Sequence, residues 1–169
     1  VDDTPYGGGA GMVMKIEPIH RCLEAVKQSR ARFTAGPEKR KIIVLSARGT
    51  QFTQQKAQEY SKLEHLILIC GRYEGIDQRV ADHLADEEIS VGPYVVAGGE
   101  LPAMLVAEAA IRLIPGVLGN SASLLDESYV VPEKLEAAQY TKPEEYNGWA
   151  VPKVLLSGNH GKIEKWRNQ

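Results

Sequence analysis

Short and almost continuous apolar runs, separated by helical patterns, constrain the fold of this chain more than any other feature. The sequence reads Lys-Ile-Ile-Val-Leu-Ser at residues 41–46 and Leu-Ile-Leu-Ile-Cys at residues 66–70, and a shorter run lies near residues 89–91. Such runs are typical of strands that are covered on both faces. Helices are predicted around them, at residues 18–33, 53–63, 76–84 and 101–114. This alternation predicts an α/β domain with a mostly parallel sheet and helices on both faces.

Glycines stand where two of these strands are predicted to end. Gly71 follows the run at residues 66–70, and Gly98-Gly99 separates Val95-Val96-Ala97 from the helix expected at residues 101–114. Glycine allows unusual backbone conformations and close approach to a ligand. Ligands of open α/β sheets bind outside the carboxyl ends of the strands, so the two joints predict one shared pocket. A tight turn without a ligand is the alternative reading of a lone Gly-Gly pair.

Composition narrows the class of protein. The 169 residues are enough for one domain with a sizeable core, and the net charge of −2 gives no sign of a nucleic-acid partner, although a local basic patch would suffice for one. Cys22 and Cys70, the only cysteines, fit reduced core thiols and a cytoplasmic location. No metal-ligand spacing is present. No apolar run approaches about 18 residues, so membrane insertion is not predicted.

Three further segments lack the periodicity of the central part. Residues 7–11 hold four glycines and fit either a nest of N–H groups for a phosphate or base or a flexible lead-in. Residues 120–132 are expected to form a flexible lid or linker inside one domain made of residues 1–119 and 133–169. Residues 151–158 are predicted to be extended, and Asn159 is expected to cap a final helix at residues 162–167.

Five motifs then stand together in one order. They are V-D-D-T-P-Y-G-G-G-A-G-M (1–12), L-I-L-I-C-G-R-Y-E-G-I-D (66–77), G-G-E-L-P-A-M (98–104), R-L-I-P-G-V-L-G-N (112–120) and V-L-L-S-G-N-H (154–160). With these motifs the chain resembles the bacterial tRNA (guanine-N1)-methyltransferases of the SPOUT class over essentially its whole length. The resemblance implies an α/β-knot with a C-terminal trefoil knot, in which S-adenosylmethionine binds. It also implies a homodimer with the active site at the subunit interface and no membrane association.

The resemblance further implies methyl transfer to N1 of the guanine immediately 3′ of the tRNA anticodon. Members of the family carry a C-terminal tRNA-binding domain, and the resemblance predicts that most of this domain lies outside the present sequence. Mg²⁺ is a further candidate cofactor. Two alternatives stay open, namely a cofactor- or RNA-binding SPOUT domain without turnover and a SPOUT methyltransferase that acts on ribosomal RNA.

Carried over position by position, the resemblance assigns a cofactor pocket to three strand ends. The assigned residues are Leu45, Ser46, Gly71, Tyr73, Glu74, Val91, Gly92, Pro93, Tyr94, Val95, Val96, Gly98, Gly99 and Pro102. Exposed strand-end peptides suit the hydrogen-bonding edge of adenine, and apolar side chains suit its faces. Core packing is the alternative for Tyr73 and Tyr94. Pro93 departs from the aspartate usual in the family, and Ala47 departs from a proline.

Transfer to N1 of guanine requires removal of the N1 proton and stabilisation of charge on O6. Arg112 matches the arginine of the family and is assigned charge stabilisation or nucleotide binding. Glu127 stands where the family has its general base, an aspartate, and Asp126 precedes it, so either carboxylate is a candidate base. Two solvated loop carboxylates are the alternative. The residues assigned to substrate binding are Asp3, Tyr6, Gly8, Gly9, Ser128 and His160.

Overall fold

The computed structural model describes residues 1–29, 36–120, 127–131 and 134–168. The chain forms two compact units, Val1–Gly119 and Asn120–Gln169, and each is described by itself. Asp126 and most of the predicted lid at residues 120–132 lie outside the described residues.

A parallel sheet forms the centre of the first unit. Its strand order is β4 (His65–Cys70), β3 (Arg40–Gln51), β5 (Glu87–Ser90), and both neighbours run parallel to β3. Every residue of β3 from Ile42 to Leu45 is buried, as a strand covered on both faces requires. The predicted parallel sheet is confirmed, although β3 continues past the predicted end with an irregular pairing between Leu45 and Thr50.

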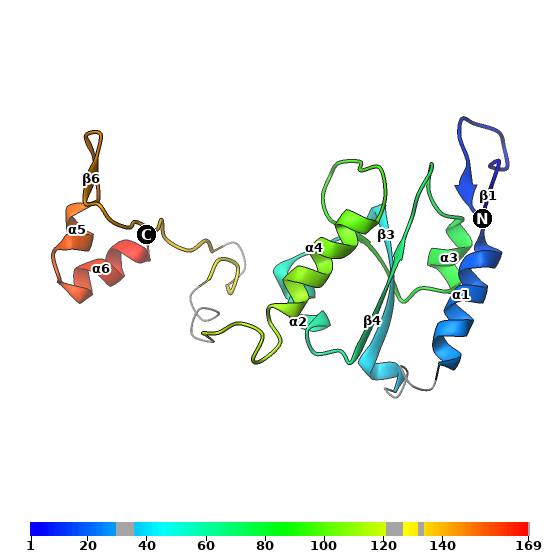
Figure 1. The fold of residues 1–169 in the computed structure, drawn as a ribbon, viewed down its shortest axis with the longest axis horizontal. Helices are drawn as coiled ribbons and strands as arrows, with labels where there is room; N and C mark the ends of the chain where they lie inside the picture. The colour runs from blue at the N-terminus through cyan, green and yellow to red at the C-terminus, as the bar shows by residue number, and fades with distance from the viewer. Residues whose placement is uncertain (30–35, 121–126, 132–133, 169) are drawn as a thin grey trace. The chain divides into compact units, whose positions relative to one another are not determined.

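Helices cover both faces of this sheet, as predicted. Helices α2 (Gln54–Tyr60) and α4 (Glu100–Ile111) lie on one face, and α1 (Ile16–Gln28) and α3 (Gln78–His83) lie on the other (Figure 1). A short 3₁₀ helix, η1 (Pro37–Lys39), precedes β3. The core on the α2 and α4 side consists of Ile43, Leu45, Tyr60, Ile89, Val106 and Ala110.

Local sequence explains where the helices begin. The side chains of Thr53, Asp77 and Asn159 each accept a hydrogen bond from a backbone N–H two or three residues further on, at the starts of α2, α3 and α6 (His160–Arg167). Asn159 therefore caps the last helix as predicted. Pro18 and Pro102 both stand in first helical turns, where the missing N–H has no helical partner to lose.

The N-terminal glycines form the loop of a small hairpin. Strand β1 (Asp2–Asp3) pairs antiparallel with β2 (Val13–Met14). The hairpin docks on the loop after β4, because the Met14 N–H donates to the Gly75 carbonyl at 2.9 Å and the Met14 carbonyl accepts from the Asp77 N–H at 2.9 Å. The glycines between the strands have positive φ angles of +85°, +78°, +132° and +79° at Gly7, Gly8, Gly9 and Gly11.

The second unit consists of small elements. A hairpin of β6 (Glu145–Tyr146) and β7 (Trp149–Ala150) turns at Asn147-Gly148, both with positive φ. It is followed by α5 (Lys153–Leu156) and α6.

Two expectations were wrong. Residues 151–158 were expected to be extended, but α5 occupies the middle of this segment. The prediction failed because the short apolar run after Pro152 does not distinguish a strand from a helix. Cys22, expected in the core, is exposed, since Leu23 takes the buried position on that face of α1.

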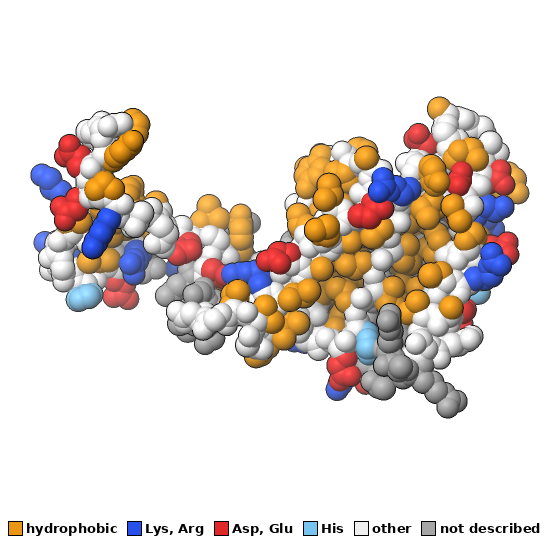
Figure 2. Space-filling view, in the orientation of Figure 1, with side chains coloured by type: hydrophobic (Ala, Val, Ile, Leu, Met, Phe, Trp, Pro, Cys, Tyr) orange, Lys and Arg blue, Asp and Glu red, His pale blue; other side chains and the backbone are white. Residues whose placement is uncertain are grey.

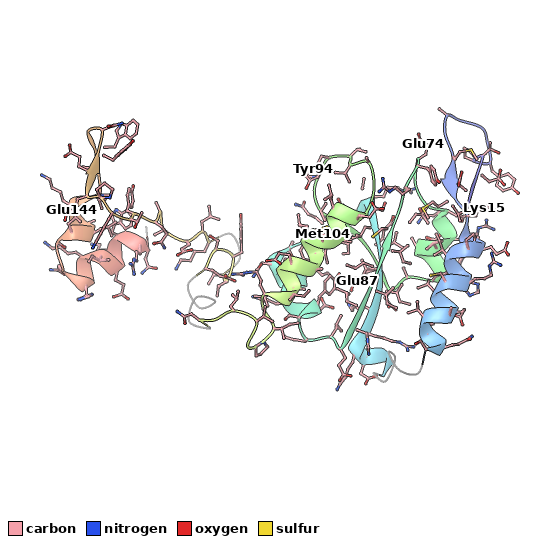
Figure 3. The ribbon with its side chains drawn as sticks, viewed as in Figure 1. Lys15, Glu74, Glu87, Tyr94, Met104 and Glu144 are labelled. Atoms are coloured by element: carbon pink, nitrogen blue, oxygen red, sulfur yellow. The ribbon has the colours of Figure 1, made fainter. Side chains whose placement is uncertain are left out.

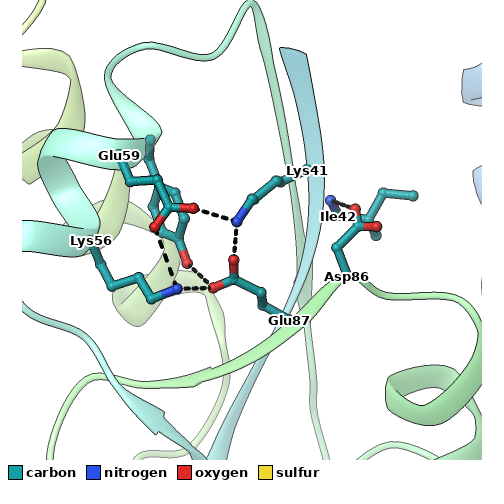
Figure 4. A network of polar contacts seen from close by, with 7 residues as sticks. Lys41, Ile42, Lys56, Glu59, Asp86 and Glu87 are labelled. Atoms are coloured by element: carbon teal, nitrogen blue, oxygen red, sulfur yellow. Dashed lines mark hydrogen bonds and ion pairs between the residues drawn. The ribbon is translucent and has the colours of Figure 1, made fainter. Parts of the chain in front are cut away.

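Charged side chains pair with one another where the strands begin. Lys41 of β3 contacts both Glu59 of α2 and Glu87 of β5 (Figure 4). The Lys56 ammonium lies 2.7 Å from Glu87, and the Tyr60 hydroxyl donates to the same carboxylate at 2.8 Å. Burial works to raise the pKa of Glu87, but these donors outweigh it and lower that pKa from 4.5 to about 2. Burial and the neighbouring carboxylate raise the pKa of Tyr60 well above its usual range.

Candidate functional site

A pocket of about 320 Å³ lies at the carboxyl ends of the strands, where the two glycine joints were predicted to meet. Figure 3 shows Glu74 and Tyr94 at this end of the sheet, on two different loops, and Glu87 nearer the other end. All of the residues assigned to cofactor binding line it except Pro93, which lies in the same loop: Leu45, Ser46, Gly71, Tyr73, Glu74, Val91, Gly92, Tyr94, Val95, Val96, Gly98, Gly99 and Pro102. The structure therefore brings the three predicted strand ends together.

The first turn of α4 lies directly against the end of β4. The Gly99 N–H donates to the Gly71 carbonyl at 2.8 Å, and a Cβ at Gly99 would lie 2.7 Å from Cys70 Cα and 2.8 Å from Gly71 N. The φ of Gly99 is an ordinary −78°. Glycine is therefore required here by the space between two backbones rather than by an unusual conformation, which corrects part of the sequence argument.

An ion pair spans the same two loops. The Arg72 Nε lies 2.8 Å from Glu100 Oε1, and both side chains are about half exposed. The pKa of Glu100 is lowered first by a hydrogen bond from its own backbone N–H and then by Arg72.

Two tyrosines stand at the mouth of the pocket. Tyr73 and Tyr94 are 57% and 54% exposed, so the alternative of core packing is wrong for both. Tyr73 has a positive φ of 60°, and the Tyr94 hydroxyl donates to the Val91 carbonyl at 3.3 Å. Their rings are open to a molecule that approaches from solvent.

The N-terminal glycine loop adjoins the pocket through Glu74. The Glu74 N–H donates to the Met12 carbonyl at 3.0 Å, and a Cβ at Gly11 would lie 2.5 Å from Glu74 Cγ. Cβ atoms at Gly7 and Gly8 would have no neighbour within 4 Å, so this loop is open to solvent. Two residues assigned to substrate binding lie on this hairpin outside its glycines. Tyr6 is fully exposed. The pKa of the Asp3 carboxyl is lowered by a hydrogen bond from the Thr4 N–H and by Lys15.

The assigned catalytic residues lie elsewhere. Arg112 caps the C-terminal end of α4, ten residues after Pro102, which is about 15 Å along a helix, and it does not line the pocket. Glu127 lies in the second unit, where it lines a different pocket of about 540 Å³ together with His160. The Ser128 hydroxyl accepts from the Glu136 N–H at 2.9 Å. Asp126, the other candidate base, is outside the described residues.

Several lining residues were missed from sequence. Arg48, Arg72, Asp77, Gln78 and Ser90 all line the pocket. The Ser90 hydroxyl, which is buried, donates to the Gly92 carbonyl at 3.0 Å and so fixes the loop after β5. The signal for Ser90 was its place as a polar residue at the end of an apolar run, two residues before Gly92.

No cluster of three or more His, Cys, Asp or Glu in the described part of the chain is arranged to hold a metal ion. None of the helices in the described part is both long and apolar enough to cross a membrane.

Comparison with known proteins assigns the chain to a family. The family model described as tRNA (Guanine-1)-methyltransferase TrmD matches residues 1–169. The tRNA (guanine-N(1)-)-methyltransferase of Bacillus subtilis is 50% identical over all of this chain and 67% of its own length. The proteins of the same name from Lactobacillus delbrueckii subsp. bulgaricus and Chromobacterium violaceum are 51% and 52% identical, over 99% of this chain and 64% of their own lengths.

The chain thus spans about two thirds of the length of these relatives. The match covers the strands, both glycine joints and the N-terminal hairpin without interruption. The chain therefore belongs to the tRNA (guanine-N1)-methyltransferase family.

Proposed function

We propose that this chain is the methyl-transferring part of a tRNA (guanine-N1)-methyltransferase. It transfers a methyl group from S-adenosylmethionine to N1 of the guanine immediately 3′ of the tRNA anticodon. One observation carries the proposal: in a chain half identical to enzymes of that name, all the assigned cofactor residues except Pro93 line one pocket. The free thiols Cys22 and Cys70 fit the cytoplasmic location proposed for the enzyme.

The residues of the pocket fit S-adenosylmethionine. Peptide groups at Gly71 and residues 91–92 suit the edge of adenine, and Leu45, Val91 and Val96 suit its faces. When bound there, the cofactor supplies an electrophilic methyl group. The contribution of the protein is chiefly to hold and align the two reactants, which provides much of the rate of a displacement reaction.

The remaining chemistry falls to side chains of this chain. N1 of guanine carries a proton at neutral pH, and a carboxylate, Glu127 or Asp126, is proposed to remove it. The Arg112 guanidinium is proposed to stabilise the charge that develops on O6, or to hold the target nucleotide. The open loop at residues 7–11, beside Glu74, is proposed to offer backbone N–H groups to that nucleotide. Asp3 and Tyr6, which precede this loop in the chain, are proposed to contact the same nucleotide.

The exposed face of α4 supports a homodimer. This helix buries Pro102, Val106 and Ala110 but leaves Leu101, Met104 and Ile111 exposed by 70%, 67% and 48%. Figure 2 shows hydrophobic side chains gathered over α4, and a helix that is apolar all round is normally covered. Arg112, about 15 Å along the helix from Pro102, does not line the pocket of its own chain, and we propose that it serves the pocket of a second subunit.

The proposal extends to the architecture of the family. Residues 133–169 would complete the methyltransferase domain with residues 1–119 as a SPOUT α/β-knot, with residues 120–132 as a lid or linker within it. Ser128 and His160 would then contact tRNA from the second unit.

Two measurements test the proposal. Calorimetry with S-adenosylhomocysteine should show that the wild-type chain binds this ligand as a dimer. A folded wild-type chain that does not bind it would refute the pocket assignment. Single-turnover reaction with a tRNA anticodon stem-loop, followed by digestion, should give 1-methylguanine at the position 3′ of the anticodon. Binding without product would favour a domain without turnover, and a product formed only on ribosomal RNA would favour the other SPOUT activity.

The role of Arg112 is tested in the same reaction. Arg112→Ala should retain cofactor binding and lose product formation. The variant Lys153→Ala, at an exposed position of α5, serves as a control with the same loss of positive charge.

A further inference from the structure

The ion pair between Arg72 and Glu100 joins two segments that are far apart in sequence. Arg72 is the second residue after β4, and Glu100 is the first residue of α4. The Gly99 N–H to Gly71 carbonyl hydrogen bond joins the same two segments one residue away on each side. One tie therefore runs through the backbone and the other through side chains.

Gly98 provides the space in which this ion pair lies. A Cβ at Gly98 would lie 2.5 Å from Glu100 Oε2 and 3.0 Å from both Cδ and Nε of Arg72. Any larger residue would displace the pair. The two adjacent glycines thus have different tasks, since Gly99 accommodates a backbone and Gly98 accommodates two charged side chains.

Arg72 also contacts the N-terminal hairpin. Its backbone N–H donates to the Met14 sulfur at 3.3 Å, and its carbonyl accepts from the Gly75 N–H at 3.2 Å. Arg72 is therefore held by the hairpin, by its own loop and, through Glu100, by α4. Among the described residues that line the pocket, no other ion pair spans two of its loops, since Asp77 pairs with Arg79 only two residues away.

We propose that Arg72 and Glu100 are positioning residues, whose ion pair fixes the loop after β4 against the start of α4 so that the pocket is formed before the methyl donor binds. This inference rests on the proposed function of the pocket. The physical reason is that glycine-rich loops have much freedom to lose on binding, and a contact that restricts them beforehand raises affinity without touching the ligand.

Calorimetric titration of the full chain with S-adenosylhomocysteine tests the pair. Arg72→Ala and Glu100→Gln should each raise the Kd about threefold to fivefold, the range expected when one half-exposed ion pair is lost. The reversed pair, Arg72→Glu with Glu100→Arg, should return the Kd to within about twofold of wild type. The KM for S-adenosylmethionine should rise in step with the Kd in the single variants and should recover with it in the reversed pair.

Arg79→Ala is the matched control, because Arg79 is 59% exposed, pairs with Asp77 at 2.6 Å and lies next to the same pocket without spanning two loops. It should bind like wild type. Hydrogen exchange gives a readout that needs no ligand: amides at residues 71–75 and 98–99 should exchange faster in Arg72→Ala than in Arg79→Ala.

The outcomes separate the inference from the proposed function. Unchanged affinity and exchange in Arg72→Ala, no recovery in the reversed pair, or an equal loss in Arg79→Ala would overturn the positioning role alone. A wild-type chain that binds no S-adenosylhomocysteine would overturn the pocket assignment as well.

Discussion

The two ends of the parallel sheet differ in their polar groups, which pair with one another at one end and surround an open pocket at the other. Where the strands begin, Lys41, Lys56, Glu59 and Glu87 pair with one another and with the Tyr60 hydroxyl (Figure 4). Where the strands end, glycines and exposed tyrosines surround a pocket. Among the described residues, the two largest changes in pKa, those of Tyr60 and Glu87, thus belong to the end without the pocket. A perturbed carboxylate marks a functional site only where it also faces a cleft, and Glu87 does not line this one.

The largest expected effect comes from closing the space at the pocket end. Gly99→Ala would bring a Cβ within 2.8 Å of two backbone atoms, Cys70 Cα and Gly71 N, which cannot rotate away. We expect a loss of about 3 kcal/mol in the free energy of unfolding and at least about tenfold weaker binding of S-adenosylhomocysteine. Denaturant unfolding and calorimetry measure the two effects. Gly119→Ala, where a Cβ meets nothing within 4 Å, is the control, and equal losses in both variants would contradict the spatial argument.

The next prediction should separate the two ends. Glu87→Gln leaves two partly buried lysines without their shared carboxylate, and we expect it to cost about 2 kcal/mol of stability. The Kd for S-adenosylhomocysteine should stay within about twofold of wild type, because Glu87 does not line the pocket. A large change in Kd would show that the two ends are coupled.

The stability of the fold at acid pH should depend on Glu87. Because folding lowers the pKa of Glu87 from 4.5 to about 2, its stabilisation is fully present above pH 4.5 and is lost as the pH falls toward 2. Unfolding titrations of wild type should show this loss, and the curve of Glu87→Gln should be flatter over the same range. Parallel curves would place the acid sensitivity in other carboxylates.

Tyr60→Phe probes the same network with a smaller change. It removes the hydroxyl that donates to Glu87 at 2.8 Å and keeps the ring that packs against Phe52. We expect a loss of about 1 kcal/mol, the usual net value of one hydrogen bond, with unchanged cofactor affinity. Thermal unfolding measured beside Glu87→Gln gives the comparison, and a loss as large as that of Glu87→Gln would mean that ring packing also changed.

The smallest effect is expected at the open glycine loop. Gly8→Ala meets no neighbour within 4 Å, so its only cost is the positive φ of +78°. We expect a loss of stability of about 1 kcal/mol or less and no change in S-adenosylhomocysteine binding. A lower activity on a tRNA stem-loop with unchanged cofactor Kd would support the proposed role of this loop in binding the target nucleotide.

Much of this arrangement is readable from local sequence. The apolar runs at residues 41–46 and 66–70 identify buried parallel strands, and Asn159 marks the start of the last helix, because strand burial and helix capping depend on neighbours in the chain. The pocket residues followed from the motifs and from the rule that ligands bind at strand ends. The short helix α5 was missed, since four apolar and basic residues after a proline carry no period.

Sequence by itself determined the alternation of strands and helices, the two glycine joints and, through its motifs, the family. Tertiary structure alone decided why those glycines are there: Gly99 meets the backbone of Cys70 and Gly71, and Gly98 meets the side chains of Arg72 and Glu100. It also decided that Lys41 and Glu87, which are 46 residues apart, share one ion-pair network. The physical reason is that conformation and burial follow from short-range patterns, whereas a contact between two chain segments exists only once the sheet has brought them side by side.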